Sequence, residues 1–134
     1  MKPLSAVVFL GLCVLVGCAD RPAPPPPLAK VSGTVIMNGK PMGGGEARFV
    51  VSGYPAKALE IKDGAFAGDV FVGKNRVEVV WDKDGPPNPM DAKGPPIKVN
   101  AVSDYFSGAN TPFVVDIDKS GKSDLKYEVQ SARK

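Results

Sequence analysis

Short runs in which apolar and polar residues alternate, separated by turn residues, constrain the fold of this chain most strongly. The alternation begins at Ala29 and gives each run one apolar face and one polar face. This period of two residues is typical of half-buried strands, whereas an amphipathic helix needs apolar residues three and four positions apart. The 15 glycines and 14 prolines among 134 residues also favour many turns over long helices. The sequence therefore predicts an all-β domain.

The turn residues divide this domain into its expected strands. Asn38-Gly39 and Asp63-Gly64 supply the positive-φ residues that tight turns require, and Gly43-Gly44-Gly45 is interpreted as a bend. The expected strands cover residues 31–37, 46–51, 57–62, 65–72 and 74–81, a short edge strand at 97–101, and 113–117 with 125–129 as a closing hairpin. We therefore expect a single sandwich of seven to eight antiparallel strands.

One segment interrupts this pattern. Residues 82–96 contain five prolines and two glycines. Because proline has no backbone N–H to donate, we expect that this segment cannot hold a ladder and forms a surface loop.

The first 17 residues have the features of a signal peptide. Lys2 precedes an apolar stretch from Val7 to Val16, which is too short to span a membrane. The stretch ends in Leu15-Val16-Gly17-Cys18, the pattern of a bacterial lipoprotein signal. We therefore expect cleavage between Gly17 and Cys18 and a covalent lipid on Cys18, with no other cofactor; a plain secretory signal is the alternative. Cys13 is lost with the signal, so the mature chain has no second cysteine for an internal disulfide.

The remainder divides into three parts. Residues 18–28 hold Cys18 and the prolines of a linker, which favour an extended polyproline II spacer. A proline-motif ligand for a partner is the other interpretation of this run. Residues 29–130 form the β-sandwich domain, and residues 131–134 are expected to be a flexible tail.

Several motifs of the domain occur in an order known from one family. In chain order they are Val31-Ser32-Gly33-Thr34-Val35, Gly39-Lys40-Pro41-Met42, the strand around Phe49, Asp63-Gly64-Ala65-Phe66, Gly73-Lys74-Asn75-Arg76-Val77-Glu78-Val79 and Val102-Ser103-Asp104-Tyr105-Phe106. Together they resemble the carboxypeptidase regulatory-like domains of small bacterial lipoproteins, over residues 29–129. The resemblance implies a transthyretin-like (prealbumin-like) sandwich that serves as a binding, scaffolding or accessory module without catalytic residues. Asn75 departs from the family, which has tyrosine there, and residues 82–96 have no counterpart in it.

The residue types present exclude most catalytic chemistry. The chain has no histidine, and its one mature cysteine is expected to carry lipid, so thiol catalysis, Ser-His-Asp catalysis and the common zinc sites are excluded. Glycoside hydrolysis would need a pair of carboxylate groups. The candidates for such a pair are Asp82 with Asp84 and Asp116 with Asp118. The run from Asp116 to Gly121 matches the first half of an EF-hand calcium loop, but the bidentate glutamate is missing and strands flank it. We interpret it as a polar turn, and we expect no enzyme and no metal site.

The candidate binding residues border the proline-rich segment. Trp81, Tyr105 and Phe106 are aromatic residues that could stack on a sugar or anchor a partner, and Asp82 and Asp84 follow closely after Trp81 in the sequence. Packing in the core is the alternative role of each aromatic residue. The net charge of +3, without a basic patch, argues against nucleic acid.

These observations together predict a location and a class of function. We expect a lipoprotein anchored in the bacterial cell envelope, facing the periplasm or the cell exterior. Its expected role is that of a non-catalytic binding or structural module for an envelope protein. The alternative is a carbohydrate-binding module for an envelope glycan.

The lipid anchor leads to a first prediction. Cys18→Ser should abolish incorporation of a labelled fatty acid and should move the protein out of the membrane fraction, because the acylated thiol is lost. Cys13→Ser is the matched control and should leave labelling unchanged. Labelling that persists in Cys18→Ser would exclude Cys18 as the lipidated residue.

Overall fold

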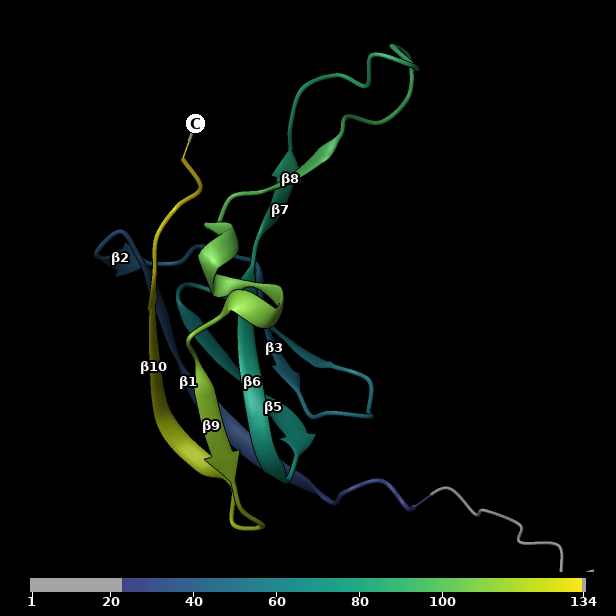
Figure 1. Cartoon of the computed structure of the whole chain (residues 1–134). Coiled ribbons are helices and arrows are strands. Elements are labelled where there is room, and N and C mark those ends of the chain that lie inside the picture. The colour runs from purple at the N-terminus through teal and green to yellow at the C-terminus, as the bar shows by residue number, and fades with distance from the viewer. Residues whose placement is uncertain (1–22, 134) are drawn as a thin grey trace, which may run out of the picture.

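A computed structural model describes residues 23–133, and the expected lipidation and cleavage sites at Cys18 and Gly17 lie outside these residues. The described chain folds into an all-β sandwich of two four-stranded sheets, with a separate two-stranded ribbon (Figure 1). The predicted fold class is therefore confirmed.

The first sheet is built around the long strand β1 (Leu28–Met37). On one side, β1 pairs with the antiparallel strand β5 (Ala65–Phe71) and then with the short β2 (Lys40–Pro41). On the other side it pairs in parallel with β10 (Lys122–Val129). Asn38 and Gly39 between β1 and β2 have φ of 52° and 80°, as the expected tight turn requires.

The second sheet is antiparallel throughout. Its strand order is β4 (Lys57–Glu60), β3 (Glu46–Val50), β6 (Gly73–Val80) and β9 (Val114–Ile117). The start of β6 is fixed by Asn75, which is fully buried and donates its side-chain N–H groups to the carbonyl oxygens of Phe71 (2.8 Å) and Gly73 (3.0 Å). Asn75 thus forms a polar brace at the turn between β5 and β6.

The core lies between the two sheets and takes apolar side chains from every strand of the two sheets except the short β2. The alternating burial of β1, β3, β6 and β10 follows the alternation in the sequence. The most deeply buried members of the core are Val35, Met42, Ala47, Phe49, Ile61, Val70, Val77, Val79 and Val102.

The predicted closing hairpin is wrong. β9 and β10 are not paired with each other: β9 pairs with β6 in the second sheet, whereas β10 pairs in parallel with β1 in the first. The chain crosses between the sheets at the turn formed by residues 118–121. Each of the two strands has one apolar row that must face the core, and that alternation is the same whether the strands are neighbours in one sheet or lie in opposite sheets.

The predicted loop at residues 82–96 is wrong at its beginning. Strand β7 (Asp82–Asp84) pairs with β8 (Lys98–Asn100), which confirms the short edge strand expected near residues 97–101. Because the first proline of the segment is Pro86, the residues before it keep the N–H groups that a ladder needs. β7 and β8 and the loop that joins them are referred to below as the ribbon.

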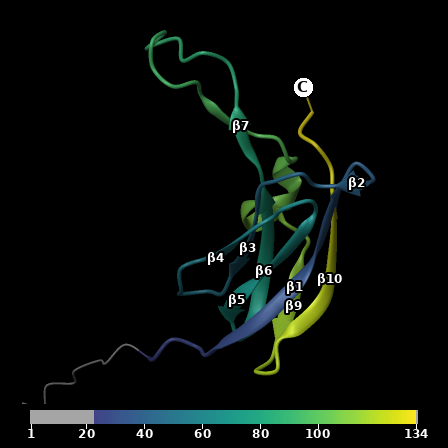
Figure 2. The same cartoon turned by 180° about the vertical axis from the view of Figure 1, so that it is seen from behind.

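The ribbon and the linker leave the sandwich at opposite ends. In both Figure 1 and Figure 2 the N-terminal linker leaves beside the turn between β9 and β10, while the ribbon extends beyond the other end. The linker is attached to the domain, because the Pro27 carbonyl oxygen accepts a hydrogen bond of 2.8 Å from the Val72 N–H.

Tyr127 leads to a prediction about stability. Its side chain is buried between the rings of Phe66 and Phe113, and its hydroxyl has no hydrogen-bond partner among the described residues. Tyr127→Phe should therefore raise the free energy of unfolding by about 1 kcal/mol at neutral pH, measured by urea denaturation, because it removes an unsatisfied buried polar group. Tyr105→Phe, at an exposed ring, is the matched control and should give no such gain.

The same residue predicts a pH dependence. Burial raises the pKa of Tyr127 to about 12, from about 10 in an unfolded chain. Between these two values the unfolded chain loses the proton first, so ionisation favours unfolding. The stability gap between Tyr127→Phe and the wild type should therefore widen from pH 10 to pH 12. A constant gap would show that the hydroxyl is not desolvated.

Candidate functional site

The root of the ribbon brings together the predicted residue Trp81 and the glycine run at residues 43–45. Trp81 follows directly after β6 and is half-buried at the end of the core, whereas Val77 and Val79 of the same strand face are fully buried. A Cβ atom on Gly44 would lie only 3.2–3.3 Å from three atoms of the indole, and Gly45 has a φ of 101°. The glycine run, expected only to bend the chain, thus also allows the backbone to approach the indole closely.

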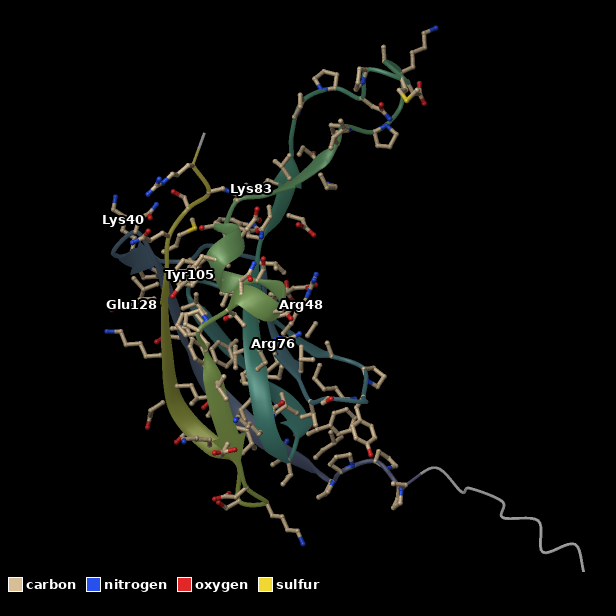
Figure 3. All side chains as sticks on the ribbon, viewed as in Figure 1. Lys40, Arg48, Arg76, Lys83, Tyr105 and Glu128 are labelled. Atoms are coloured by element: carbon tan, nitrogen blue, oxygen red, sulfur yellow. The ribbon has the colours of Figure 1, made fainter. Side chains whose placement is uncertain are left out.

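A lysine covers this indole from the ribbon. The Lys83 Nζ atom lies 3.6 Å from the centroid of the Trp81 ring, within the range of a cation–π contact. Figure 3 shows Lys83 at the root of the ribbon. Lys83 was not among the candidate binding residues identified from the sequence; its position two residues after Trp81 in an extended strand was the available signal. A sugar could stack on this ring face only by displacing the ammonium group.

Asn100 fixes the other side of the root. Its side-chain Oδ1 accepts hydrogen bonds from the N–H groups of Trp81 (2.9 Å) and Val102 (3.1 Å). The Ala101 N–H donates to the Trp81 carbonyl oxygen at 2.8 Å. These bonds join the ribbon to the sandwich, which matters because an isolated two-stranded ribbon is only marginally stable.

The two faces of the ribbon differ in character. Lys83 lies directly opposite Val99, while Asp82 pairs with Asn100 and Asp84 with Lys98. Since opposed residues of an antiparallel pair point to the same side, the predicted residues Asp82 and Asp84 lie on a polar face, where Asp84 forms an ion pair with Lys98. Strand alternation places Trp81, Lys83, Ile97 and Val99 on the other side, which is referred to below as the apolar face.

The apolar face is open to solvent. Ile97 and Val99 are 43% and 42% exposed, and Met90, in the loop at the tip, is 95% exposed. Gly85 lies against Val99: a Cβ atom there would come within 2.8 Å of the valine methyl group. Ile97 and Val99 thus leave part of their apolar surface exposed on this side of the ribbon.

The structure separates the two other predicted aromatic residues. Both lie on the short 3-10 helix η1 (Asp104–Phe106), but Tyr105 is 58% exposed and Phe106 only 8%. Their rings meet edge to face, with centroids 5.1 Å apart. The Phe106 ring stacks on Phe113 at a centroid distance of 5.6 Å, and Phe113 in turn contacts Tyr127 at 4.8 Å, so this row of rings leads into the core. Tyr105 therefore remains a candidate for binding, held in place by core packing, while Phe106 is a core residue.

The carboxylate groups considered for catalysis or calcium lie apart from this root or on its polar face. In the turn after β9, Asp118 accepts hydrogen bonds from the backbone N–H of Ser120 (2.9 Å) and from the Ser120 hydroxyl. These bonds, the hydroxyl contact foremost, lower the pKa of Asp118. Within residues 23–133 no group of three or more acidic, histidine or cysteine side chains could hold a metal ion. The turn interpretation of this segment agrees with the Asp118 contacts.

A shallow depression of about 550 Å³ lies beside Trp81. The residues that line it include the glycine run together with Glu46, Glu60 and Asp82. Glu46 and Glu60 are directly opposed across β3 and β4, and each has its own basic partner, Arg48 at 3.0 Å and Lys62 at 3.3 Å. The depression is therefore an open surface beside Trp81, in which the charges of Glu46 and Glu60 are paired with neighbouring basic residues. No helix among the described residues is long and apolar enough to cross a membrane.

Comparisons with known proteins assign no family to this chain. No family model and no curated protein matches the chain. Among solved structures, it is similar to the crystal structure of a DUF3823 family protein from Parabacteroides merdae ATCC 43184, with 18% sequence identity and a TM-score of 0.45. The match covers 79% of this chain and 47% of that protein, so the chain spans about half its length.

The contact between Lys83 and Trp81 leads to a prediction. A double-mutant cycle with Lys83→Met and Trp81→Leu should give a coupling energy of about 0.5–1 kcal/mol in urea unfolding, the range of an exposed cation–π pair. Lys40→Met combined with Trp81→Leu is the matched control, since Lys40 lies on β2 away from the ribbon (Figure 3). Additive effects of Lys83→Met and Trp81→Leu would mean that the ammonium group does not bind the indole.

Proposed function

We propose that this protein is a lipid-anchored, non-catalytic binding module of the bacterial cell envelope, and that its ribbon engages a partner protein. We also propose that its sandwich is a carboxypeptidase regulatory-like domain. The observation that carries the binding role is the apolar face of the ribbon, where the neighbouring aliphatic residues Ile97 and Val99 are both exposed beside Trp81 and Lys83, since apolar side chains that gather on an exposed surface are a feature of interaction sites. Two of the resembling motifs lie in β1 and at the start of β5, and these two strands pair with each other.

The position of the ribbon supports this role for an anchored protein. The linker leaves one end of the sandwich and the ribbon extends from the other (Figures 1 and 2). A lipid on Cys18 would therefore leave the ribbon on the side away from the membrane, where it can reach a partner. The proline linker adds distance and stiffness between the two.

We propose that the protein is not an enzyme because of where its carboxylate groups lie. Asp82 and Asp84 are exposed on the polar face of the ribbon, and Asp84 is engaged by Lys98. Glycoside hydrolysis would need two carboxyl groups facing one another across a substrate cleft. Side chains that share one face of a narrow ribbon do not provide this arrangement.

A carbohydrate-binding role is favoured by one observation and remains the second candidate. Tyr105 has an exposed ring above a depression of about 480 Å³, whose lining includes Asp104, Gln130 and Arg133. Such a site would use Tyr105 in place of Trp81, whose ring is covered by Lys83. Envelope glycans that bind with an affinity reduced by Tyr105→Ala but not by Tyr105→Phe would support this candidate.

A replacement of the ribbon tests the main proposal. Substituting residues 83–99 by Asn-Gly keeps the pair formed by Asp82 and Asn100 and keeps the two hydrogen bonds that Asn100 accepts. The sandwich should still fold, with a midpoint of thermal unfolding within a few degrees of the wild type, because no residue of the core cluster is removed. The protein that crosslinks to the wild type in intact cells should no longer be recovered.

Controls decide how this result is interpreted. The variant must remain in the membrane fraction at wild-type amount, and Lys40→Glu should recover the crosslinked protein as the wild type does. Recovery of the same partner by the folded, ribbonless variant would refute the proposed function.

A further inference from the structure

The apolar face of the ribbon carries a single charge. Among its four residues only Lys83 is charged, and the acidic side chains of the strands, Asp82 and Asp84, lie on the opposite face. Asp84 already has a cationic partner in Lys98. Lys83 has no carboxylate partner within the described part of the chain, and its ammonium group lies over the Trp81 indole instead. On the two strands of the ribbon, both carboxylate groups thus lie on the polar face and Lys83 is the one charged residue of the apolar face.

Any partner that covers Ile97 and Val99 must also cover or border Lys83, because Lys83 lies directly opposite Val99. An ammonium group that loses its water without gaining an anion is strongly unfavourable in an interface. The cation–π contact with Trp81 offsets only a small part of this cost. A complementary surface therefore needs a carboxylate group at this position.

The edges of the ribbon make docking on its face more favourable than strand addition. Each of its strands has only three residues, and the outward edge of β8 carries Lys98. Prolines at positions 86, 87, 95 and 96 also remove backbone donors from the segment that follows. Short, charged, proline-flanked edges are features that oppose pairing with a further strand.

We infer that the apolar face, Trp81, Lys83, Ile97 and Val99, docks against an apolar surface of a partner protein that presents an aspartate or glutamate to Lys83. This inference rests on the proposed function and names the chemistry of the partner. Ile97 and Val99 provide the buried apolar contact, and Lys83 provides the specificity. In the complex the ammonium group is shared between the indole and the partner's carboxylate, so a partner with a basic residue at this position is rejected.

Photo-crosslinking from the two faces of the ribbon tests the inference. A benzophenone amino acid is placed at position 99, on the apolar face, or at position 98, on the polar face, of the full-length protein in intact cells. Position 99 should give a protein adduct and position 98 should give at least about tenfold less, because the two side chains point to opposite sides. The crosslinked peptide, identified by mass spectrometry, should contain apolar residues with an aspartate or glutamate.

Charge variants then test the role of Lys83. Lys83→Glu should reduce the adduct from position 99 at least about tenfold, whereas Lys83→Arg and the control Lys40→Glu should leave it near the wild-type yield. Replacing the partner's carboxylate by lysine should restore the adduct in Lys83→Glu. Each variant is checked for an unchanged midpoint of thermal unfolding, so that a loss of yield reports docking.

The outcomes separate the two proposals. Equal adducts from positions 98 and 99, an adduct unaffected by Lys83→Glu, or an adduct with a second copy of this chain would overturn the inference while leaving a protein-binding ribbon in place. The absence of any protein adduct from either position, or adducts with lipid alone, would overturn the proposed function as well.

Discussion

The fold depends on one constraint: each strand supplies a single row of apolar side chains, and an opposing sheet must cover that row. β1 lies at the centre of the first sheet, with β5 and β10 on either side, and its apolar row belongs to the same core cluster as that of β6 in the second sheet. This arrangement covers most apolar residues of the sandwich strands, although Leu28 and Val114 at strand ends stay exposed. The strand formed by β6 and β7 continues past the edge of the core, and there the constraint is no longer met, because the ribbon has an apolar face but no second sheet above it.

Trp81 marks the point at which burial changes to exposure. Its indole rests against the glycine run on the sandwich side and under Lys83 on the ribbon side. Asn100 ties the two strands of the ribbon to the sandwich through hydrogen bonds that do not depend on the core. The root is therefore held by local polar and aromatic contacts, and the ribbon is presented in a defined direction without a core of its own. A preorganised surface of this kind loses less conformational entropy when it binds.

The position of the site in the molecule agrees with a binding role at a membrane. The linker leaves the end of the sandwich that lies opposite the ribbon. The Pro27 carbonyl oxygen accepts a hydrogen bond from the Val72 N–H where the chain enters β1. Anchoring by lipid at one end and recognition at the other would let the sandwich act as a spacer. Tyr105 offers a second, separate surface, supported by the ladder of aromatic rings that leads from Phe106 into the core.

The sequence alone determined most of the strands and turns. Alternation identified the longer strands of the sandwich, because side chains on successive strand residues point to opposite faces, but it did not identify the short strands β2 and β7. Asn38-Gly39 marked a turn, because it supplies the positive φ angles that few other pairs adopt. Local chemistry was sufficient for these features.

Only the tertiary structure decided which strands are neighbours and which aromatic residues are exposed. The alternation in residues 113–117 and 125–129 is compatible with one hairpin or with two sheets, and the packing of both apolar rows on one core placed β10 beside β1. Tyr105 and Phe106 are adjacent aromatic residues, and the 3-10 turn that carries them sends one ring inward and leaves the other exposed. The apolar face of the ribbon also depended on the pairing of Lys83 with Val99, residues 16 positions apart. Such contacts join distant parts of the chain, and no local pattern specifies them.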